Sequence, residues 1–344
     1  MRTKVLGKTG LVVSDMGFGA LPIQRTEQNE AIKILRRAFE EGVNYFDTAR
    51  LYSDSEEKIG LAFSDVRKDI VISTKSQCSN VEQLKRDFET SLKMLKTDYV
   101  DIFQFHNPDF TFTTDRAMEM YNHLLELKKA GAIRHIGITA HKYGLALEHI
   151  QSGLFETLQY PISMLAGEKD FEVINAASKA QMGIIAMKAL SGGLITNARA
   201  AAAWMQAHPE IVPIWGIQHM RELNEFLELY ENGVELNSEA ETIIENEKRE
   251  LSGAFCRGCG YCAPCTIDLP IHLYARLPYM LRRMPTTGYF TEDFAAKVER
   301  ISECTDCGVC KTRCPYELDC PELLRIALED FRMLYAAFKA KEHK

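Results

Sequence analysis

Residues 70–106 read IVISTKSQCSNVEQLKRDFETSLKMLKTDYVDIFQFH. Two short apolar runs, Ile70–Thr74 and Tyr99–His106, stand on either side of a longer stretch, Val81–Leu95, in which apolar and charged residues are mixed. Short apolar runs are typical of strands that are buried on both faces, as in a parallel sheet. The segment therefore predicts a strand, a helix and a second strand, joined as one β–α–β unit.

The same alternation runs from about Val12 to Tyr230. The runs predicted as strands are Met16–Leu21, Asn44–Asp47, Ile70–Thr74, Tyr99–His106, His135–Ala140, Thr157–Tyr160, Gly183–Met187 and Ile211–Trp215. The helices predicted between them include Glu27–Glu41, Val81–Leu95, Asp115–Lys129 and Asp170–Gln181. Such a series of units is what an α/β protein with a closed (β/α)8 TIM barrel needs, and it favours closure over an open doubly wound sheet.

Further elements are predicted outside this alternation. Lys4–Ser14 is expected to form a hairpin that closes the barrel floor. We expect residues 1–235 to form the barrel and residues 236–254 a linker built on the Glu-rich helix Asn237–Leu251. Residues 255–344 are expected to form a ferredoxin-like α+β domain that ends in a helix, Pro321–Lys341.

The composition argues against several classes of protein. The chain has 344 residues, of which 46% are hydrophobic, and a formal net charge of −7. It has no basic stripe, which argues against a nucleic-acid partner. No apolar run reaches the ~18 residues of a membrane-spanning helix, and the N-terminal residues lack the apolar core of a secretory signal. We therefore expect a cytoplasmic protein with no membrane or nucleic-acid partner.

Cysteine is concentrated near the C-terminus, where nine of the ten lie between Cys256 and Cys320. Most of them form two runs, Cys256-x2-Cys259-x2-Cys262-x2-Cys265 and Cys304-x2-Cys307-x2-Cys310-x3-Cys314-Pro315. The second run has the spacing of bacterial ferredoxins, in which three thiolates surround one corner of an iron–sulfur cube and the fourth ligand comes from elsewhere. The two runs therefore predict two [4Fe–4S] clusters.

The ferredoxin spacing implies crossed ligation, because the fourth cysteine of each run in two-cluster ferredoxins binds the other cluster. The expected ligands are Cys256, Cys259, Cys262 and Cys314 for one cluster, and Cys304, Cys307, Cys310 and Cys265 for the other. Structural zinc is the alternative, although three evenly spaced cysteines fit a zinc site poorly. The first run departs from the ferredoxin pattern at Thr266, where proline is usual. We interpret Cys320 and Cys78 as packing thiols.

Four polar residues lie at or just after the C-terminal ends of predicted strands: Asp47, Tyr52, Lys75 and His106. These ends share one face of a barrel, so the side chains can converge. Reduction of a carbonyl needs a proton donor such as a tyrosine, an ammonium that favours its phenolate, a carboxylate that holds the ammonium, and a neutral imidazole that orients the carbonyl oxygen. Each residue alone has a structural explanation; the set of four favours catalysis.

Three motifs carry a family resemblance. They are Leu6-Gly7-Lys8-Thr9-Gly10-Leu11-Val12-Val13-Ser14, Phe46-Asp47-Thr48-Ala49-x2-Tyr52-x2-Ser55-Glu56-Glu57-x2-Gly60, and Ser91-Leu92-x2-Leu95-x2-Asp98-Tyr99-x-Asp101. The chain resembles the aldo-keto reductases over about residues 3–235, and the cysteine-rich region resembles the branch of that family with a C-terminal dicluster ferredoxin domain. The resemblance implies that the four polar residues are a catalytic tetrad, with Tyr52 as the acid and Lys75 as its tuner. It also implies a nicotinamide cofactor, usually NADPH, bound without a Rossmann fingerprint.

The resemblance further assigns residues to the cofactor. They are Thr139 and Gln159 at the nicotinamide amide, Ser191, Gly193 and Leu194 in the loop that passes the pyrophosphate, and Gln218 and Arg221 near the adenosine end. Arg221 would meet a 2′-phosphate or be a solvated charge. The sequence departs from the family at Ala140 and Phe226, each of which stands where an asparagine is usual.

We predict an NADPH- or NADH-dependent oxidoreductase that interconverts a small-molecule carbonyl and an alcohol. The clusters are expected to be structural or to relay electrons to an external redox protein, with a flavin as a candidate mediator. Three alternatives stay open: a lyase, dehydratase or epimerase on the same barrel, an electron-transfer subunit that uses the barrel as a scaffold, and an iron or oxygen sensor. The intact tetrad disfavours the last two.

Overall fold

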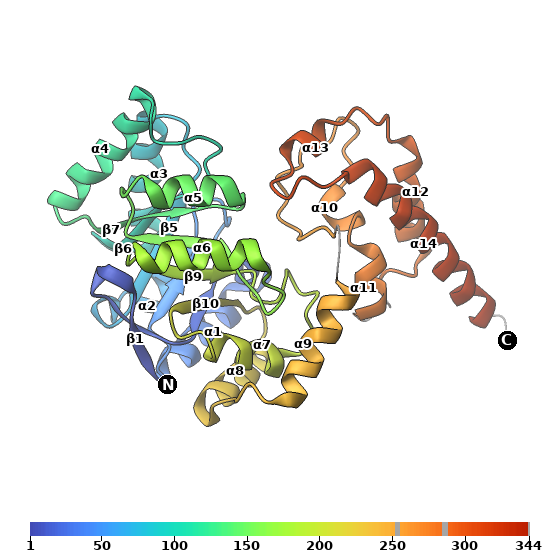
Figure 1. Cartoon of the computed structure of the whole chain (residues 1–344), viewed down its shortest axis with the longest axis horizontal. Helices are drawn as coiled ribbons and strands as arrows, with labels where there is room; N and C mark the ends of the chain where they lie inside the picture. The colour runs from blue at the N-terminus through green and yellow to red at the C-terminus, as the bar shows by residue number, and fades with distance from the viewer. Residues whose placement is uncertain (252–254, 284–287, 343–344) are drawn as a thin grey trace. The chain divides into compact units, whose positions relative to one another are not determined.

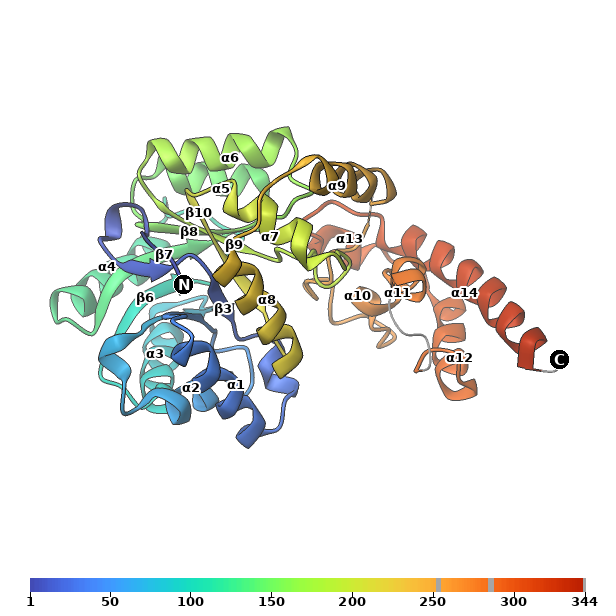
Figure 2. The same cartoon turned by 90° about the horizontal axis from the view of Figure 1, so that it is seen from below.

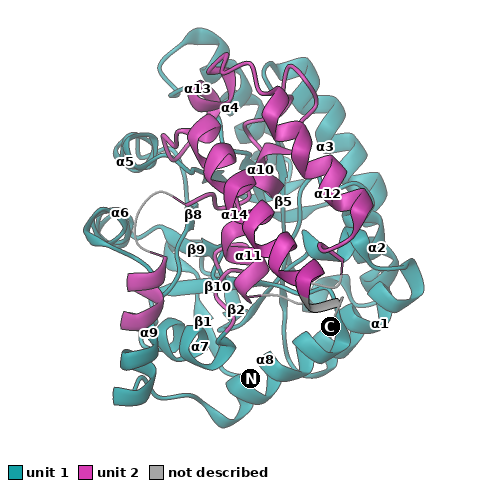
Figure 3. Cartoon of the chain, turned by 90° about the vertical axis from the view of Figure 1, so that its right-hand side faces the viewer, with its two compact units in different colours: residues 1–190, 197–244 teal, residues 191–196, 245–344 magenta. Residues whose placement is uncertain are grey.

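The structure, a computed structural model, describes residues 1–251, 255–283 and 288–342. The end of the predicted linker (252–254) and two parts of the predicted C-terminal domain (284–287 and 343–344) lie outside the described residues. The chain divides into two compact units, which Figure 3 shows in different colours. The first unit is Met1–Leu190 with Asn197–Ile244, and the second is Ser191–Thr196 with Glu245–Lys344. The units are therefore interleaved in sequence.

The first unit contains a closed barrel of parallel strands, as the alternation predicts (Figure 1). Hydrogen bonds join the strands in the order β10-β3-β4-β5-β6-β7-β8-β9. Their bounds are β3 Gly17–Gly19, β4 Tyr45–Asp47, β5 Val71–Ser76, β6 Val100–Phe105, β7 Ile133–Thr139, β8 Thr157–Pro161, β9 Gly183–Met187 and β10 Ile211–Gly216. Since all of them are parallel, their C-terminal ends lie at one end of the barrel.

Helices surround these strands, as Figures 1 and 2 show from two directions. They are α1 Gln28–Glu40, α2 Ser55–Phe63, α3 Val81–Leu95, α4 Asp115–Lys129, α5 Tyr143–Gln151, α6 Glu168–Lys179, α7 Ala198–Gln206 and α8 Met220–Asn232. In α1 the buried residues Ala31, Ile34, Leu35 and Ala38 recur at helical spacing, so one face of the helix packs inward. The side chain of Glu27 caps this helix by accepting a hydrogen bond from the backbone N–H of Asn29.

A hairpin of β1 (Thr3–Val5) and β2 (Val12–Ser14) precedes the barrel and closes its floor, as expected. The buried cluster there consists of Leu6, Val13, Tyr45, Val71, Ile102, Ile185, Val212 and Ile214. Gly7 has a φ of +51°, and a Cβ at this position would lie 2.3 Å from the backbone nitrogen of Gly183. This close approach of two backbones explains why the turn has a glycine here.

The second unit is built from helices and turns. Its helices, the first of which starts in the barrel unit, are α9 Ser238–Glu250, α10 Ile271–Tyr274, α11 Leu277–Arg283, α12 Glu292–Glu299, α13 Val309–Arg313 and α14 Cys320–Glu342. Buried residues such as Leu277, Val298 and Phe331 form its core. The sequence analysis predicts an α+β domain, but none of the described residues of this unit is in a strand. Glycines with positive φ interrupt the cysteine runs, for example Gly258 (φ +64°) and Gly308 (φ +71°), and they turn the chain where a strand needs extended backbone.

The longest helix in the described part of the chain is α14, with 23 residues. It carries charged residues along its length, among them Arg325, Asp330 and Lys339. Within the described ranges, no helix combines the length and apolar character required to cross a membrane.

Replacement of Leu6 by alanine tests the floor of the barrel. Leu6 is 1% exposed within the floor cluster, and a truncation of this kind costs about 2–5 kcal/mol of unfolding free energy. We expect this loss in urea unfolding followed by circular dichroism. Val12→Ala is the matched control, because Val12 is 53% exposed and its truncation should change the unfolding free energy by no more than ~0.5 kcal/mol. Equal losses for the two variants would contradict a packed floor.

Candidate functional site

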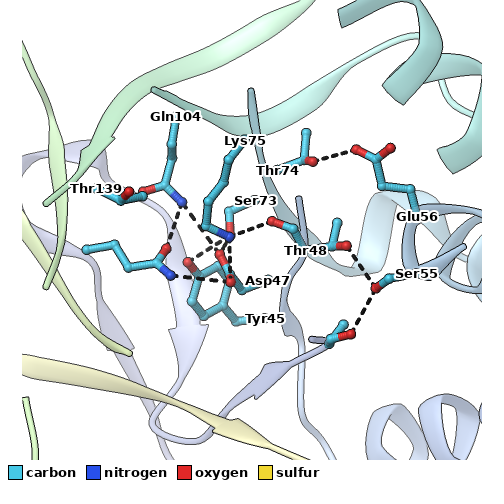
Figure 4. Close-up of polar contacts among 12 residues, drawn as sticks. Tyr45, Asp47, Thr48, Ser55, Glu56, Ser73, Thr74, Lys75, Gln104 and Thr139 are labelled. Carbon is cyan, nitrogen blue, oxygen red and sulfur yellow. Dashed lines mark hydrogen bonds and ion pairs between the residues drawn. The ribbon is translucent and has the colours of Figure 1, made fainter. Parts of the chain in front are cut away.

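Asp47 and Lys75 form a buried ion pair inside the barrel (Figure 4). The Nζ atom of Lys75 lies 2.7 Å from Oδ2 of Asp47, and the two side chains are 1% and 2% exposed. Lys75 also donates to the backbone carbonyl of Thr48, and Ser73 Oγ donates to Oδ1 of Asp47 at 2.6 Å. Buried charges are tolerated when they are paired and their remaining hydrogen-bonding capacity is used. These bonds meet that condition.

The barrel register explains why these residues meet. Asp47 ends β4 and pairs with Ser73 of β5, and Lys75 lies two residues further along the same strand. Residues two apart in a strand point to the same side, so Ser73 and Lys75 both face Asp47. Lys75 in turn pairs with Gln104 of β6, which places an amide beside the ion pair.

Tyr52 lies in the loop between β4 and α2, and its ring lies beside both Lys75 and His106. The Nζ atom of Lys75 is 5.3 Å from the centre of the Tyr52 ring. The ring centres of Tyr52 and His106 are 5.9 Å apart, and the ring planes meet edge to face at 83°. The structure thus brings together Asp47, Tyr52, Lys75 and His106 at the C-terminal end of the barrel.

Burial sets the electrostatics of this group of residues. It lowers the pKa of Lys75, and the adjacent Asp47 carboxylate opposes this shift. Burial also lowers the pKa of His106 to about 3, and the charge of Lys75 acts in the same direction. The imidazole is therefore neutral near pH 7. Its Nδ1 atom is buried and has no hydrogen-bond partner among the described residues.

Two of the residues assigned to the cofactor lie beside this group and make hydrogen bonds within the chain. Gln159, on β8, accepts a hydrogen bond from Nε2 of Gln104 at 2.9 Å and donates one to Oδ2 of Asp47 at 3.5 Å. The Oγ1 atom of Thr139, at the end of β7, accepts from the backbone N–H of Asn107 at 2.7 Å. Both side chains are 1% exposed.

The remaining residues assigned to the cofactor fall into two groups. Gln218 and Arg221 follow β10, at the end of the barrel that carries the tetrad. The side chain of Gln218 accepts a hydrogen bond from Arg25 at 3.1 Å. Arg221 is exposed in the first turn of α8. Ser191, Gly193 and Leu194 belong to the second unit. These three residues therefore belong to the same unit as the cysteine runs, whereas the tetrad belongs to the other unit.

Two cavities in the second unit are lined by cysteines. One is lined by Cys256, Cys259, Cys262 and Cys314 together with Cys320, and the other by Cys265, Cys304, Cys307 and Cys310. Each set combines three cysteines of one run with a late cysteine of the other run. A [4Fe–4S] cluster takes four cysteine thiolates, so the donor set of each cavity fits such a cluster.

The chemistry of the thiols also fits metal binding. A hydrogen bond from Cys320 lowers the pKa of Cys314 to about 6, which favours the thiolate that binds metals. Burial raises the pKa of Cys262 to about 12, which favours the neutral thiol while no cation is bound. Cys320 is buried, and its Sγ lies 3.8 Å from the carbonyl oxygen of Cys310. Among the described residues, no group of three or more His, Cys, Asp or Glu side chains is arranged to hold a single metal ion.

Sequence reasoning missed three residues of the barrel site. Ser73 and Gln104 bind Asp47, and each lies two positions before a tetrad residue, a signal that strand periodicity contained. His141 follows β7 and is buried; burial holds its pKa well below the usual range, and the charge of Lys188 acts in the same direction. Its place just after a strand end was the signal for this residue.

Comparisons with known proteins agree with this arrangement. A model of the aldo/keto reductase family matches residues 15–252, and a model of the 4Fe-4S dicluster domain matches residues 255–319. The oxidoreductase YqkF of Bacillus subtilis is 30% identical over 211 residues, which is 57% of this chain and 67% of that protein. L-galactose dehydrogenase of Arabidopsis thaliana is 28% identical over 229 residues, which is 60% of this chain and 71% of that protein.

Solved structures show the same barrel. An aldo-keto reductase from Pseudomonas aeruginosa is similar with a TM-score of 0.59 at 25% identity, over 66% of this chain and 93% of that one. The holo form of an aldo-keto reductase from Bacillus halodurans has a TM-score of 0.63 at 21% identity, over 72% of this chain and 96% of that one. At this identity the second comparison concerns the fold alone.

The buried neutral His106 predicts a pH dependence of stability. Its pKa is lower in the folded chain than in the unfolded chain, so the unfolded chain binds more protons between about pH 3 and pH 6.5. The unfolding free energy should therefore fall as the pH drops from 6.5 to 5, by at most ~1.4 kcal/mol per pH unit for one histidine. In His106→Asn this decrease should be smaller. Urea unfolding at several pH values measures it, and equal slopes for both proteins would contradict a buried neutral imidazole.

Serine replacements test the crossed cysteine sets. We expect Cys314→Ser to lose the cluster of the first set and Cys265→Ser to lose that of the second, so that iron falls from about eight to about four atoms per chain. Cys320→Ser is the matched control, because Cys320 lines the first cavity beside Cys314 but is not assigned as a ligand. Iron and sulfide counts after anaerobic purification, with electron paramagnetic resonance of the reduced protein, provide the measurement. Loss of iron in Cys320→Ser but not in Cys314→Ser would show that Cys320, and not Cys314, is the fourth ligand of the first cluster.

Proposed function

Since the chain belongs to the aldo/keto reductase family and has a C-terminal 4Fe-4S dicluster domain, we propose that it is an NAD(P)H-dependent oxidoreductase that interconverts a small-molecule carbonyl and an alcohol. The observation that carries the proposal is the buried Asp47–Lys75 ion pair beside the Tyr52 ring. An ion pair of this kind serves proton transfer when a phenol and a neutral imidazole lie next to it, as Tyr52 and His106 do here.

In this proposal each side chain has one task in the reduction. When bound, a nicotinamide cofactor would supply the hydride that the carbonyl carbon accepts. Tyr52 donates its phenol proton to the carbonyl oxygen, and the Lys75 ammonium stabilises the phenolate that remains. Asp47 holds Lys75 in place, and the neutral His106 donates a hydrogen bond to the same oxygen. The sum is carbonyl, NAD(P)H and one proton to alcohol and NAD(P)+.

The residues for the nucleotide are part of the same proposal. Gln159 and Thr139 would bind the carboxamide, which requires that Gln159 exchange a hydrogen bond with Gln104 or Asp47 for one with the cofactor. Ser191, Gly193 and Leu194 would lie along the pyrophosphate, and Gln218 near the adenosine. The exposed charge of Arg221 would meet a 2′-phosphate, which favours NADPH over NADH.

The clusters call for a separate role, because a hydride carries two electrons and a [4Fe–4S] cluster carries one. We propose that the two cysteine sets hold clusters that exchange electrons with an external redox protein. Cys307 is exposed, which supports exchange at the second set. A flavin would be needed to divide the electron pair if the clusters take part in turnover.

Tyr52→Phe tests the reaction. The variant lacks the proton donor, so we expect kcat to fall by about 10²–10⁴-fold, while the Kd for NADPH changes little. Tyr143→Phe is the matched control; Tyr143 lies on α5 and its hydroxyl binds Glu172. Steady-state kinetics with a panel of aldehydes and ketones, and calorimetric titration with NADPH, give the two quantities.

The outcomes separate the proposal from its alternatives. An unchanged kcat in Tyr52→Phe would remove Tyr52 as the acid. Turnover of a substrate by wild-type protein that binds no NADPH or NADH would favour a lyase, dehydratase or epimerase on the same barrel.

A further inference from the structure

The segment Ser191–Thr196 connects the two units through the chain itself. The chain leaves the barrel unit at Leu190 and returns to it at Asn197, and the residues between belong to the cysteine-rich unit. The same segment contains Ser191, Gly193 and Leu194, to which the proposed function assigns the pyrophosphate of the nucleotide. Contacts that hold this segment within the second unit therefore act on the residues proposed to bind the pyrophosphate.

Two arginines of the second unit hold the segment by its carbonyl groups. Arg276 donates from Nη2 to the carbonyl oxygen of Gly192 at 2.6 Å, and Arg283 donates from Nη1 to that of Leu194 at 2.9 Å. Arg283 also pairs with Glu247 and Glu250, each at 2.6 Å, so the α9 carboxylates balance its charge. No ion pair of Arg276 with a carboxylate occurs among the described residues.

Arg276 also packs against the first cysteine run. A Cβ at Gly258 would lie 2.6 Å from Nη1 of Arg276, so the guanidinium lies directly against this glycine. The backbone N–H of Gly258 in turn donates to Sγ of Cys256 at 3.4 Å. A Cβ at Gly192 would lie 3.1 Å from the carbonyl oxygen of Arg257. Arg276 thus lies against both the cysteine turn at Gly258 and the segment at Gly192.

The guanidinium of Arg276 has hydrogen-bond donor capacity that is not used by the described residues. The Nε atom of Arg276 is buried and has no hydrogen-bond partner in the described part of the chain. A buried donor without a partner is costly, and a cation beside a cysteine set is satisfied by negative charge on that set. The Arg276 guanidinium thus donates to the carbonyl of Gly192 and lies against the turn of the first cysteine run at Gly258.

We propose that Arg276 is a positioning residue that couples the charge on the first cysteine set to the affinity of the segment Ser191–Thr196 for a nucleotide pyrophosphate. This inference rests on the proposed function. One-electron reduction, by dithionite or a reduced viologen, of a [4Fe–4S] cluster held by the first cysteine set would add one negative charge there, and this charge would attract the Arg276 guanidinium more strongly. Its hydrogen bond to Gly192 weakens, and the segment is held less firmly for an anionic ligand. The reduced protein therefore binds the nucleotide more weakly than the oxidised protein.

Linkage makes this coupling measurable from both sides. If reduction weakens nucleotide binding by some factor, bound nucleotide must disfavour reduction by the same factor. Coupling of ~5-fold or more is the usual range for linked sites. For a one-electron couple a factor of five corresponds to a fall of about 40 mV in the reduction potential, since a factor of ten is about 59 mV.

The probes are two compounds, ADP-ribose and 2′-phospho-ADP-ribose. Both carry the pyrophosphate, and neither can exchange a hydride. Anaerobic calorimetry of the full chain, oxidised and then reduced with dithionite, gives the two Kd values. Spectroelectrochemical titration followed by electron paramagnetic resonance, with and without the probe, gives the potential. We expect a Kd at least ~5-fold higher in the reduced protein and a correspondingly lower potential with the probe bound.

Four variants assign the effect to Arg276, after iron counts show that each retains its clusters. Arg276→Gln keeps a donor for Gly192 but removes the charge. The oxidised variant should therefore bind the probe, and its Kd for the probe should no longer depend on reduction. Arg283→Gln loosens the same segment at Leu194 and should weaken binding equally in both states. Arg282→Gln, whose wild-type side chain pairs with Asp330, should behave as wild type. Arg276→Lys, which keeps the charge, should retain the dependence and replaces Arg276→Gln if that variant does not fold.

The outcomes distinguish this inference from the proposed function. If oxidised wild-type protein binds neither probe, the proposed nucleotide function fails. If it binds a probe with the same Kd in both states, the coupling is absent and the inference fails while the proposed function stands. If Arg276→Gln keeps the full dependence on reduction, Arg276 does not carry the coupling.

Discussion

The structure of the barrel site depends on one interaction, the ion pair of Asp47 and Lys75. An ammonium buried inside a barrel is unfavourable unless a carboxylate and other acceptors surround it. Asp47 and the carbonyl of Thr48 supply these acceptors, and Ser73, Gln104 and Gln159 in turn satisfy Asp47. The ring of Tyr52 lies next to this pair, 5.3 Å from the Nζ atom of Lys75, and the proposed role of Tyr52 as an acid depends on that ammonium.

The ion pair also accounts for the state of His106. A buried cation on β5 disfavours a second positive charge at the end of β6, and burial acts in the same direction. The barrel therefore keeps one cation and one neutral imidazole side by side. A hydrogen-bond donor without a charge suits a carbonyl oxygen, whereas a protonated histidine would compete with the proton donor.

Much of the fold was available from the sequence, because a parallel barrel repeats one simple pattern. The short apolar runs marked the strands, and the tetrad residues followed from their place at strand ends. Ser73 and Gln104 were not found, since an interior polar residue has no signal until the register across strands is known. The described residues of the second unit contain no strand, although an α+β domain was expected, because glycine turns shape the backbone of the cysteine runs. That Ser191–Thr196 belongs to the second unit could not be read from local sequence, because it depends on contacts with Arg276 and Arg283, which are distant along the chain.

The interleaving of the two units has a consequence for how such a protein could arise. A domain appended after the last barrel helix can be gained or lost by one recombination event at a single junction. Here residues 191–196 belong to the second unit although they lie between two barrel segments in the chain, so a graft onto another barrel would also require that recipient to carry a suitable version of residues 191–196. A substitution in that segment therefore alters the packing of the second unit as well as a connection between two barrel elements.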